Sequence, residues 1–204
     1  MRVWKNRGKN EKEIFYKEFD LGVCLKVDFD KQQLIYPESK GFIVNERQTC
    51  NFSANENFVV FECVHRLLNQ GYNPAHIELE PKWQVGHGAS GGRADILIKD
   101  NTGKSYLIIE CKTAGVEFDK AWNTTQTRPT QLFSYAQQER STRFIALYAS
   151  DYIDNQVTSN YYLINLFDSD EILKSKKLKC YQDATTVEEI YQIWRDTYSR
   201  DYTS

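Results

Sequence analysis

Two apolar runs in the middle of the chain are separated by turn residues. The first covers residues 94–99 and the second covers residues 106–112, and Asp-Asn-Thr-Gly occupies positions 100–103 between them. Short apolar runs joined by such residues predict a β-hairpin. The second run is apolar enough to be a buried central strand until it ends in Glu-Cys-Lys.

Apolar residues at helical spacing predict helices on both sides of this hairpin. The clearest pattern covers residues 53–69, where Ser53 and Glu56 match a capping box and Gly71 is placed to end the helix. The capping box by itself accounts for an acid at position 56. Further helices are predicted at residues 13–19, 117–122, 131–140 and 187–198.

Other segments alternate or run apolar over strand lengths. They predict a hairpin from residues 21–29 and 33–36, a strand over 76–85 that Pro81 interrupts, and strands at 143–149 and 161–166. The order strand, helix, strand from residue 106 to residue 149 predicts a right-handed parallel crossover. The sequence therefore predicts an α/β fold.

Charged residues stand at the end of the central hairpin. Alternation along a strand places Glu110 and Lys112 on one side and Cys111 on the other. Asp95 lies on the adjoining strand, where it can approach Glu110. Charges at the end of a buried strand are costly unless they are paired or bind a metal. Two carboxylates and an ammonium predict a hard-cation site for phosphate chemistry, and a solvent-exposed Glu-x-Lys without function is the alternative.

Composition excludes several classes of protein. The chain is 41% hydrophobic and 14% aromatic, as globular proteins are, and it has no apolar stretch of membrane-spanning length and no apolar signal core near its start. We therefore expect a cytoplasmic protein that does not enter a membrane. Its five scattered cysteines argue against a disulfide framework and a zinc ribbon. The net charge of −2 argues against a globally basic surface for nucleic acid, although lysines cluster locally at 5–9 and 174–179.

The glycine-rich segment 86–92 matches the letters of a dinucleotide-binding fingerprint. That fingerprint requires a following helix, and here a strand is predicted to follow. A Walker loop is excluded because Lys-Ser/Thr is missing. The segment is therefore interpreted as a turn, or as a backbone loop that approaches phosphate.

The order of these elements resembles the PD-(D/E)xK nuclease superfamily. Arg-Ala-Asp-Ile-Leu-Ile, Ile-Ile-Glu-Cys-Lys-Thr and Gln-Leu-Phe-Ser-Tyr together look like the nuclease domain of type I and related fused restriction-modification enzymes, over roughly residues 51–150. Ala94 replaces the proline of the superfamily's name motif. The resemblance implies a mixed central β-sheet flanked by helices, the restriction-endonuclease-like core, at residues 51–167. We expect an N-terminal β-hairpin extension at 1–50 and a C-terminal helical extension at 168–204.

The resemblance also implies Mg²⁺-dependent cleavage of double-stranded DNA, with Mn²⁺ as a substitute ion. The metal ligands it implies are Glu56, Asp95, Glu110 and the carbonyl of Cys111. The catalytic residues it implies are Asp95, Glu110, Lys112 and Gln131, with Lys112 acting on the attacking water. The substrate contacts it implies are Arg93, Gln131 and Tyr135, although Tyr135 packing in the core and Gln131 as an ordinary first-turn residue stay open.

Restriction enzymes of this type work with translocase or methylase modules, and neither a Walker loop nor an Asn-Pro-Pro-Tyr motif occurs in this chain. Methylase, specificity or translocase modules on a larger chain or complex are therefore expected partners. Two alternatives remain open. The chain is a catalytically inactive, nuclease-like DNA-binding or assembly module, or it is a recombination-type exonuclease or junction resolvase.

Overall fold

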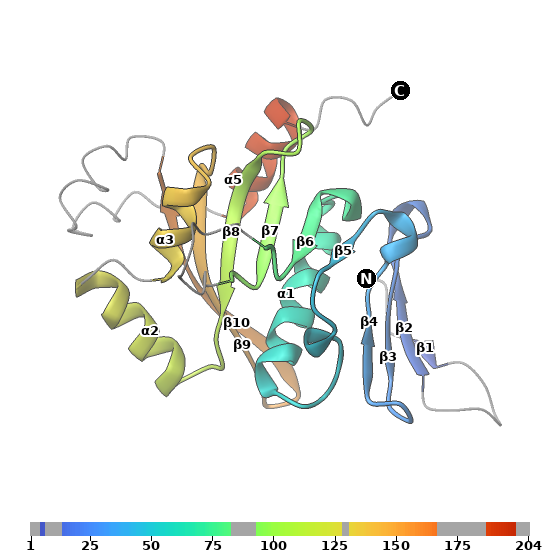
Figure 1. Ribbon diagram of the computed structural model, residues 1–204. Helices are drawn as coiled ribbons and strands as arrows, with labels where there is room; N and C mark the ends of the chain where they lie inside the picture. Colours follow the sequence, from blue (N-terminus) through green and yellow to red (C-terminus); the bar gives the residue numbers. More distant parts are fainter. Residues whose placement is uncertain (1–4, 7–13, 83–92, 128–130, 167–186, 199–204) are drawn as a thin grey trace.

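The computed structural model describes residues 5–6, 14–82, 93–127, 131–166 and 187–198 (Figure 1). Its central feature is a six-stranded sheet with the strand order β10-β9-β8-β7-β6-β5. The strands of this sheet are β5 (Ile43–Val44), β6 (Ile77–Leu79), β7 (Ile96–Lys99), β8 (Ser105–Cys111), β9 (Phe144–Ile153) and β10 (Gln156–Asn165). The pairs β5–β6 and β8–β9 are parallel and the other neighbours are antiparallel. The predicted α/β fold with a mixed central sheet is confirmed.

The predicted central hairpin is β7 and β8, which pair in antiparallel register from Ile96↔Ile109 outward. The turn between them is closed by the carboxylate of Asp100, which accepts hydrogen bonds from the backbone N–H groups of Thr102 and Lys104. Strand β9 returns parallel to β8, as the strand–helix–strand order predicts. Strand β8, which carries Glu110, therefore lies inside the sheet between β7 and β9.

A second, antiparallel sheet precedes the central one. It consists of β1 (Lys5–Asn6), β2 (Ile14–Glu18), β3 (Cys24–Asp28) and β4 (Gln33–Ile35). The predicted hairpin at 21–29 and 33–36 is confirmed in β3 and β4. The helix predicted at 13–19 is wrong, because residues 14–18 pair along their whole length with β3 and this pairing overrides the local helical preference. Alternation begins only at Cys24, since Leu21 has a φ of 57° in a 3₁₀ turn.

Helices cover both faces of the central sheet. They are α1 (Asn55–Gln70), α2 (Val116–Thr127), α3 (Gln131–Gln138) and α5 (Val187–Ile193), which continues as a π-helical turn, Trp194–Tyr198. Within the described residues, 3₁₀ turns cover Asp20–Gly22, Glu38–Lys40, Arg47–Cys50 and Pro74–His76. The predicted helix at 117–122 is longer in the structure, and so is the predicted strand at 161–166. Figure 1 shows α2 and α3 on the opposite side of the strands from α1. No helix of the described residues is long and apolar enough to cross a bilayer.

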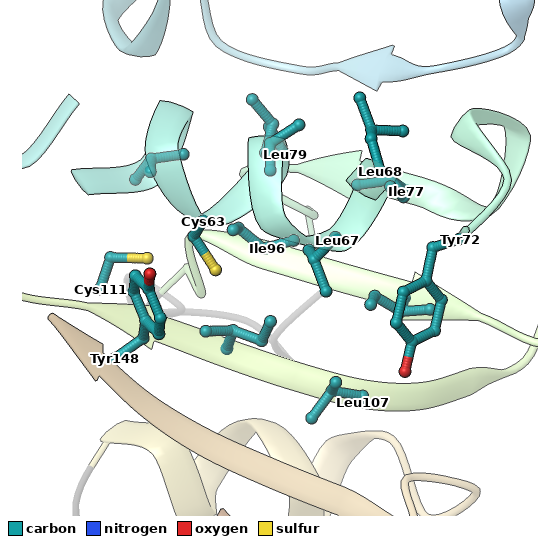
Figure 2. Packing of buried hydrophobic residues seen from close by; sticks show 14 of the residues in the cluster. Cys63, Leu67, Leu68, Tyr72, Ile77, Leu79, Ile96, Leu107, Cys111 and Tyr148 are labelled. Atoms are coloured by element: carbon teal, nitrogen blue, oxygen red, sulfur yellow. The ribbon is translucent and has the colours of Figure 1, made fainter. Parts of the chain in front are cut away.

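The largest core lies between α1 and the sheet. Figure 2 shows Cys63 and Leu67 of α1 turned toward Ile96, Leu107 and Cys111 on the strands. The opposite face of β8 carries Ile108, which packs with residues of α3 in a second cluster. This division follows from the two-residue alternation of a strand and confirms that Cys111 faces away from Glu110.

The N-terminal sheet and α5 share the α1 core. Leu25 and Leu34 of the N-terminal sheet are buried in the same cluster as α1. In the π-helical turn after α5, Trp194 is 2% exposed and its indole N–H donates to the carbonyl oxygen of Lys99 at 2.9 Å. The hydroxyl of Tyr106 donates to the carbonyl oxygen of Ile190 at 2.8 Å. The proposed boundaries after residues 50 and 167 stay predictions.

Candidate active site

The end of β8, the start of β7 and the start of α1 meet at one edge of the central sheet. The register Ile96↔Ile109 places Asp95 opposite Glu110, one position beyond the last paired residues of the two strands. The carboxylate of Asp95 accepts a hydrogen bond from the backbone N–H of Cys111 at 2.6 Å. Asp95 is therefore held across the hairpin at the height of Glu110, as alternation along the two strands predicts.

Lys112 joins the carboxylates at this edge. Its Nζ lies 3.0 Å from Oε1 of Glu110 and 3.4 Å from each carboxylate oxygen of Glu56, and it donates to the carbonyl oxygen of Cys111 at 2.8 Å. The backbone N–H of Lys112 donates to the carbonyl oxygen of Tyr148 on β9, which fixes the chain there. We call Glu56, Asp95, Glu110 and Lys112 the acid–lysine cluster. The Cys111 carbonyl, predicted as a metal ligand, accepts from Lys112 in this structure.

The predicted capping box of α1 does not form, and the side chain of Glu56 contacts Lys112. The N-cap of α1 is Ala54, one residue after the predicted Ser53, and it offers no side-chain hydrogen bond. The N–H of Ser53 donates instead to the side chain of Asn51. A capping box therefore does not account for Glu56, whose carboxylate lies 3.4 Å from the Lys112 ammonium. The predicted C-terminus is confirmed, since Gly71 ends the helix with a φ of 112°.

Burial dominates the electrostatics of the cluster. It raises the pKa of Asp95, and the negative charge of Glu110 raises it further. Burial also raises the pKa of Glu110, although the ammonium of Lys112 opposes this. Burial disfavours the charge on Lys112, but the carboxylates of Glu110 and Asp95 outweigh it and raise the Lys112 pKa. The cluster therefore combines three acids with one ammonium, and burial penalises any of these acids that is charged without a partner.

One carboxylate oxygen of the cluster has no hydrogen-bond partner in the part of the chain that the structure describes. Oε2 of Glu110 is buried and makes no hydrogen bond to any residue that the structure describes. An unsatisfied buried carboxylate oxygen is costly and is rare in native proteins. A bound cation or a ligand donor would satisfy it.

Glu80 is a further acid at this edge that the sequence did not single out. It follows β6, its N–H donates to the carbonyl oxygen of Asp95 at 3.0 Å, and its φ of 49° is unusual for a residue with a side chain. Burial raises its pKa, and the charges of Arg93, Glu46, Glu56 and Lys112 also act on it. The sequence feature that could have identified Glu80 is its position directly before Pro81, at the end of a strand.

The remaining predicted residues lie around the cluster. Gln131 is the first residue of α3, and its side chain lies outside the described part of the structure. Tyr135 is fully buried, and its hydroxyl donates to the carbonyl oxygen of Arg93 at 2.5 Å. The guanidinium of Arg93 lies 3.0 Å from Oε1 of Glu46. These contacts favour a packing role for Tyr135, and its predicted contact with substrate stays a prediction. The glycine-rich segment 86–92 also lies outside the described residues.

The acid–lysine cluster suits a hard cation in its chemistry. Among the residues described, no group of three or more His, Cys, Asp or Glu side chains is close enough to hold a metal ion. Mg²⁺ commonly binds proteins through one or two carboxylates and completes its shell with water and substrate phosphate. Asp95 and Glu110 offer such carboxylates. Oε2 of Glu110, which has no hydrogen-bond partner among the described residues, is available as a metal ligand.

Of two comparisons with known proteins, one found a matching family and the other found no match. A search of curated proteins finds no match. Residues 55–160, slightly more than half of the 204-residue chain, match the family described as the type I restriction enzyme R protein N terminus. The matched span contains the whole acid–lysine cluster and Glu80. The chain belongs to this family of type I restriction enzyme R protein N-terminal domains.

Proposed function

We propose that this chain is a Mg²⁺-dependent DNA endonuclease of the PD-(D/E)xK type that acts within a restriction system. The observation that carries the proposal is the meeting of Glu56, Asp95, Glu110 and Lys112 at one sheet edge. Family membership supports a restriction-related role, with DNA and other subunits or modules as partners. Three acids beside one ammonium support a cation, because a buried acid that is charged is stable only when it is compensated.

Asp95 and Glu110 would hold the metal, with Glu56 assisting directly or through water. When bound, Mg²⁺ neutralises charge on the phosphate that is cleaved. The backbone N–H of Cys111 keeps Asp95 turned toward the site. Because Glu110 also contacts Lys112, metal binding and the lysine position are coupled through one carboxylate.

Lys112 positions the attacking water and donates to the phosphate oxygen on which charge develops. In the hydrolysis, the water oxygen bonds to phosphorus, the bond from phosphorus to the leaving sugar oxygen breaks, and that oxygen gains a proton as the water loses one. Glu56 and Glu110 hold the ammonium from two sides. Gln131, at the start of α3, is proposed to orient Lys112 or to contact the DNA backbone.

A plasmid assay tests this proposal. Wild type is expected to nick or cut supercoiled DNA with Mg²⁺ and to stop in EDTA, while Asp95→Ala and Lys112→Ala lose at least about 100-fold in rate. Lys104→Ala is the matched control, because Lys104 is an exposed lysine in the turn of the same hairpin. Equal behaviour of wild type and both site variants would overturn the catalytic assignment.

Two further measurements separate the alternatives. Calorimetry with Mg²⁺ or Mn²⁺ is expected to show binding to wild type that Glu110→Ala loses, whether or not cleavage requires a partner. Activity restricted to linear ends or four-way junctions would identify an exonuclease or a resolvase. Absence of both metal binding and cleavage would identify a catalytically inactive module.

A further inference from the structure

Strands β9 and β10 continue past the end of β8 as a two-stranded arm. Strand β8 pairs with β9 only as far as Tyr148, whereas β9 and β10 stay paired up to the turn that joins them. We call residues 150–153 and 156–159 the β-arm. In its turn, Asp154 and Asn155 have φ values of 51° and 61°, the left-handed pair that closes a two-residue hairpin. The β-arm is therefore a tight element that is formed before any partner binds.

The β-arm exposes large apolar side chains. Tyr152 is 66% exposed, Ile153 is 51% exposed and Val157 is 50% exposed. Within the described part of the chain, the two strands of the β-arm pair only with each other. A two-stranded hairpin is marginally stable in water, and a contiguous exposed apolar patch commonly marks an interaction site. The β-arm therefore has the properties of a docking element.

The β-arm forms one wall of a groove whose other wall is the start of α1. Tyr152 and Val157, which pair directly across the β-arm, line this groove together with Phe58 of α1, which is 40% exposed. Figure 1 shows the tip of the β9–β10 hairpin beside the first turns of α1. The groove has a volume of about 420 Å³, which is in the range of binding pockets. It can therefore take up apolar side chains of a partner.

The charge of this surface favours a protein partner over DNA. Asp151 and Asp154 are exposed, and the segment 144–166 contains no lysine, arginine or histidine. Glu62, the other acid that lines the groove, is paired with Arg66. DNA binding depends on cations that neutralise phosphates, so a surface with aspartates alone repels the DNA backbone. Two copies of the chain that met through their β-arms would bring like charges together. A protein segment with apolar side chains flanked by Lys or Arg suits the surface instead.

The groove extends to residues next to the acid–lysine cluster. Asn55, which directly precedes Glu56, lines the groove. Thr113, which directly follows Lys112, lines it as well. At the base of the β-arm, the carbonyl oxygen of Tyr148 accepts a hydrogen bond from the backbone N–H of Lys112. A partner in the groove therefore contacts the elements that hold Glu56 and Lys112 in place.

We propose that the β-arm and this groove form a docking site for another protein module of the restriction system, which inserts apolar side chains and brings Lys or Arg to Asp151 and Asp154. The proposal rests on the proposed function in one respect, because the restriction system supplies the partner. It does not require this chain to cut DNA. The closed turn and the paired strands favour docking, because an element that is already ordered loses little conformational entropy on binding.

Fluorescence titration of the labelled full chain tests the proposal. The probes are the methylase, specificity and translocase modules of the same restriction system, each purified and added separately. At least one module is expected to bind wild type. Tyr152→Thr and Val157→Thr keep strand-forming residues and are expected to weaken this binding about 10-fold or more, as the loss of apolar anchors does. Asp151→Asn and Asp154→Asn should weaken it about 2–5-fold and reduce its dependence on salt.

Matched controls lie in the N-terminal sheet, away from the groove. Leu21→Ser removes an apolar side chain that is 85% exposed, and Asp30→Asn removes an exposed acid. Both variants should bind the module as wild type does, and weakening by either would show a general surface effect and overturn the proposal. Thermal melting shows whether each variant folds. The two aspartate variants change only exposed charges, so they test the site even if Tyr152→Thr unfolds.

Three other results would overturn the proposal. Wild type that binds none of the modules has no partner of the proposed kind. Equal binding of a module by wild type and by all four groove variants would place the contact elsewhere on the chain. Groove variants that lose affinity for a DNA duplex or for a second copy of the chain, with module binding unchanged, would assign the surface to that ligand.

The docking proposal and the nuclease proposal fail in different ways. If the groove variants lose module binding while the plasmid assay shows no metal-dependent cleavage, the docking site stands and the nuclease proposal fails. If wild type cuts plasmid with Mg²⁺ while the groove variants bind every module as wild type does, the nuclease proposal stands and the docking site is wrong.

Discussion

The ammonium of Lys112 lies 3.4 Å from both carboxylate oxygens of Glu56, although the two residues are 56 positions apart in the chain. This contact joins the first turn of α1 to the end of β8. Glu110 holds the same ammonium at 3.0 Å. Lys112 is therefore fixed by two acids from different elements, and the loss of either acid should change its position.

Glu56→Gln is expected to reduce cleavage about 10–100-fold, as replacements of supporting residues around metal sites commonly do. Glu56 is one of the acids that raise the Lys112 pKa, although Glu110 and Asp95 contribute more. Glu188→Gln, at an exposed position of α5, is the control. Cleavage by Glu56→Gln at the wild-type rate would show that Lys112 does not need Glu56.

Asp95→Asn is expected to stabilise the metal-free protein while abolishing cleavage. Burial and then Glu110 raise the Asp95 pKa, so the folded state resists a charge there, and the asparagine oxygen can still accept from Cys111. We expect a gain of about 1–2 kcal/mol, or roughly 2–8 °C in melting temperature in EDTA. Mg²⁺ should raise the melting temperature of wild type but not that of the variant.

Asp100→Asn is the control for this experiment, because Asp100 lies in the turn of the same hairpin and binds backbone N–H groups there. Its replacement should lower the melting temperature slightly and leave cleavage intact. A fall in melting temperature for Asp95→Asn as well would contradict the idea that charge repulsion destabilises the site.

Tyr135→Phe distinguishes packing from substrate contact. The hydroxyl of Tyr135 is committed to the carbonyl oxygen of Arg93, and the ring is fully buried. We expect a loss of about 1 kcal/mol in the free energy of unfolding, typical of one hydrogen bond, with cleavage and DNA affinity nearly unchanged. A large fall in DNA affinity with normal stability would instead support a substrate role.

His65 is expected to make the protein acid-sensitive. Burial, followed by the charges of Lys17 and Arg66, lowers the His65 pKa to about 4 from 6.5. The unfolded chain takes up this proton near pH 6.5 and the folded chain only near pH 4, so stability falls as the pH falls through this window. Urea denaturation should give a free energy of unfolding about 2 kcal/mol lower at pH 5 than at pH 7 from this residue. His65→Gln should lose that part of the difference, and an equal difference in both proteins would refute the assignment.

Trp194→Ala tests how far the folding unit extends beyond the family match, which ends at residue 160. Trp194 is almost fully buried against Tyr72 and His76, and its indole N–H donates to Lys99. Removing it should cost about 3–5 kcal/mol of stability. Trp122→Ala, whose stacking partner Tyr162 is on the edge strand, serves as a partly buried comparison and should cost less. A similar small loss for both would place α5 outside the cooperative core.

Patterns within short stretches of sequence were enough to predict the elements that form from residues close together in the chain. The β7–β8 hairpin follows from two apolar runs around a turn, and alternation alone separates Glu110 from Cys111. Helix α1 follows from its periodicity and from Gly71. By contrast, β2 is a strand only because β3 is available as a partner, and no periodicity within residues 13–19 records that partner.

The same distinction holds for the site. Asp95, Glu110 and Lys112 were found because strand geometry brings them together within one hairpin. Glu56 needed the tertiary structure, because its sequence context matched a cap that Ala54 occupies instead. Glu46 was missed, since parallel pairing of β5 with β6 brings it to the edge and such pairing leaves no short-range signal. Glu80 was missed, since it lies beside Asp95 only through the pairing of β6 with β7, which are distant in the chain.

The strand order has a consequence for when the acid–lysine cluster is completed during synthesis. Strand β8 is flanked by β7, which precedes it, and by β9, which is made more than thirty residues later and whose Tyr148 carbonyl anchors the backbone of Lys112. When the Glu-Cys-Lys segment has just emerged from the ribosome, β9 has not yet emerged, and β8 lacks its second neighbouring strand. Under the proposed function, the nascent protein cannot cut nearby DNA until its later half has emerged and joined the sheet.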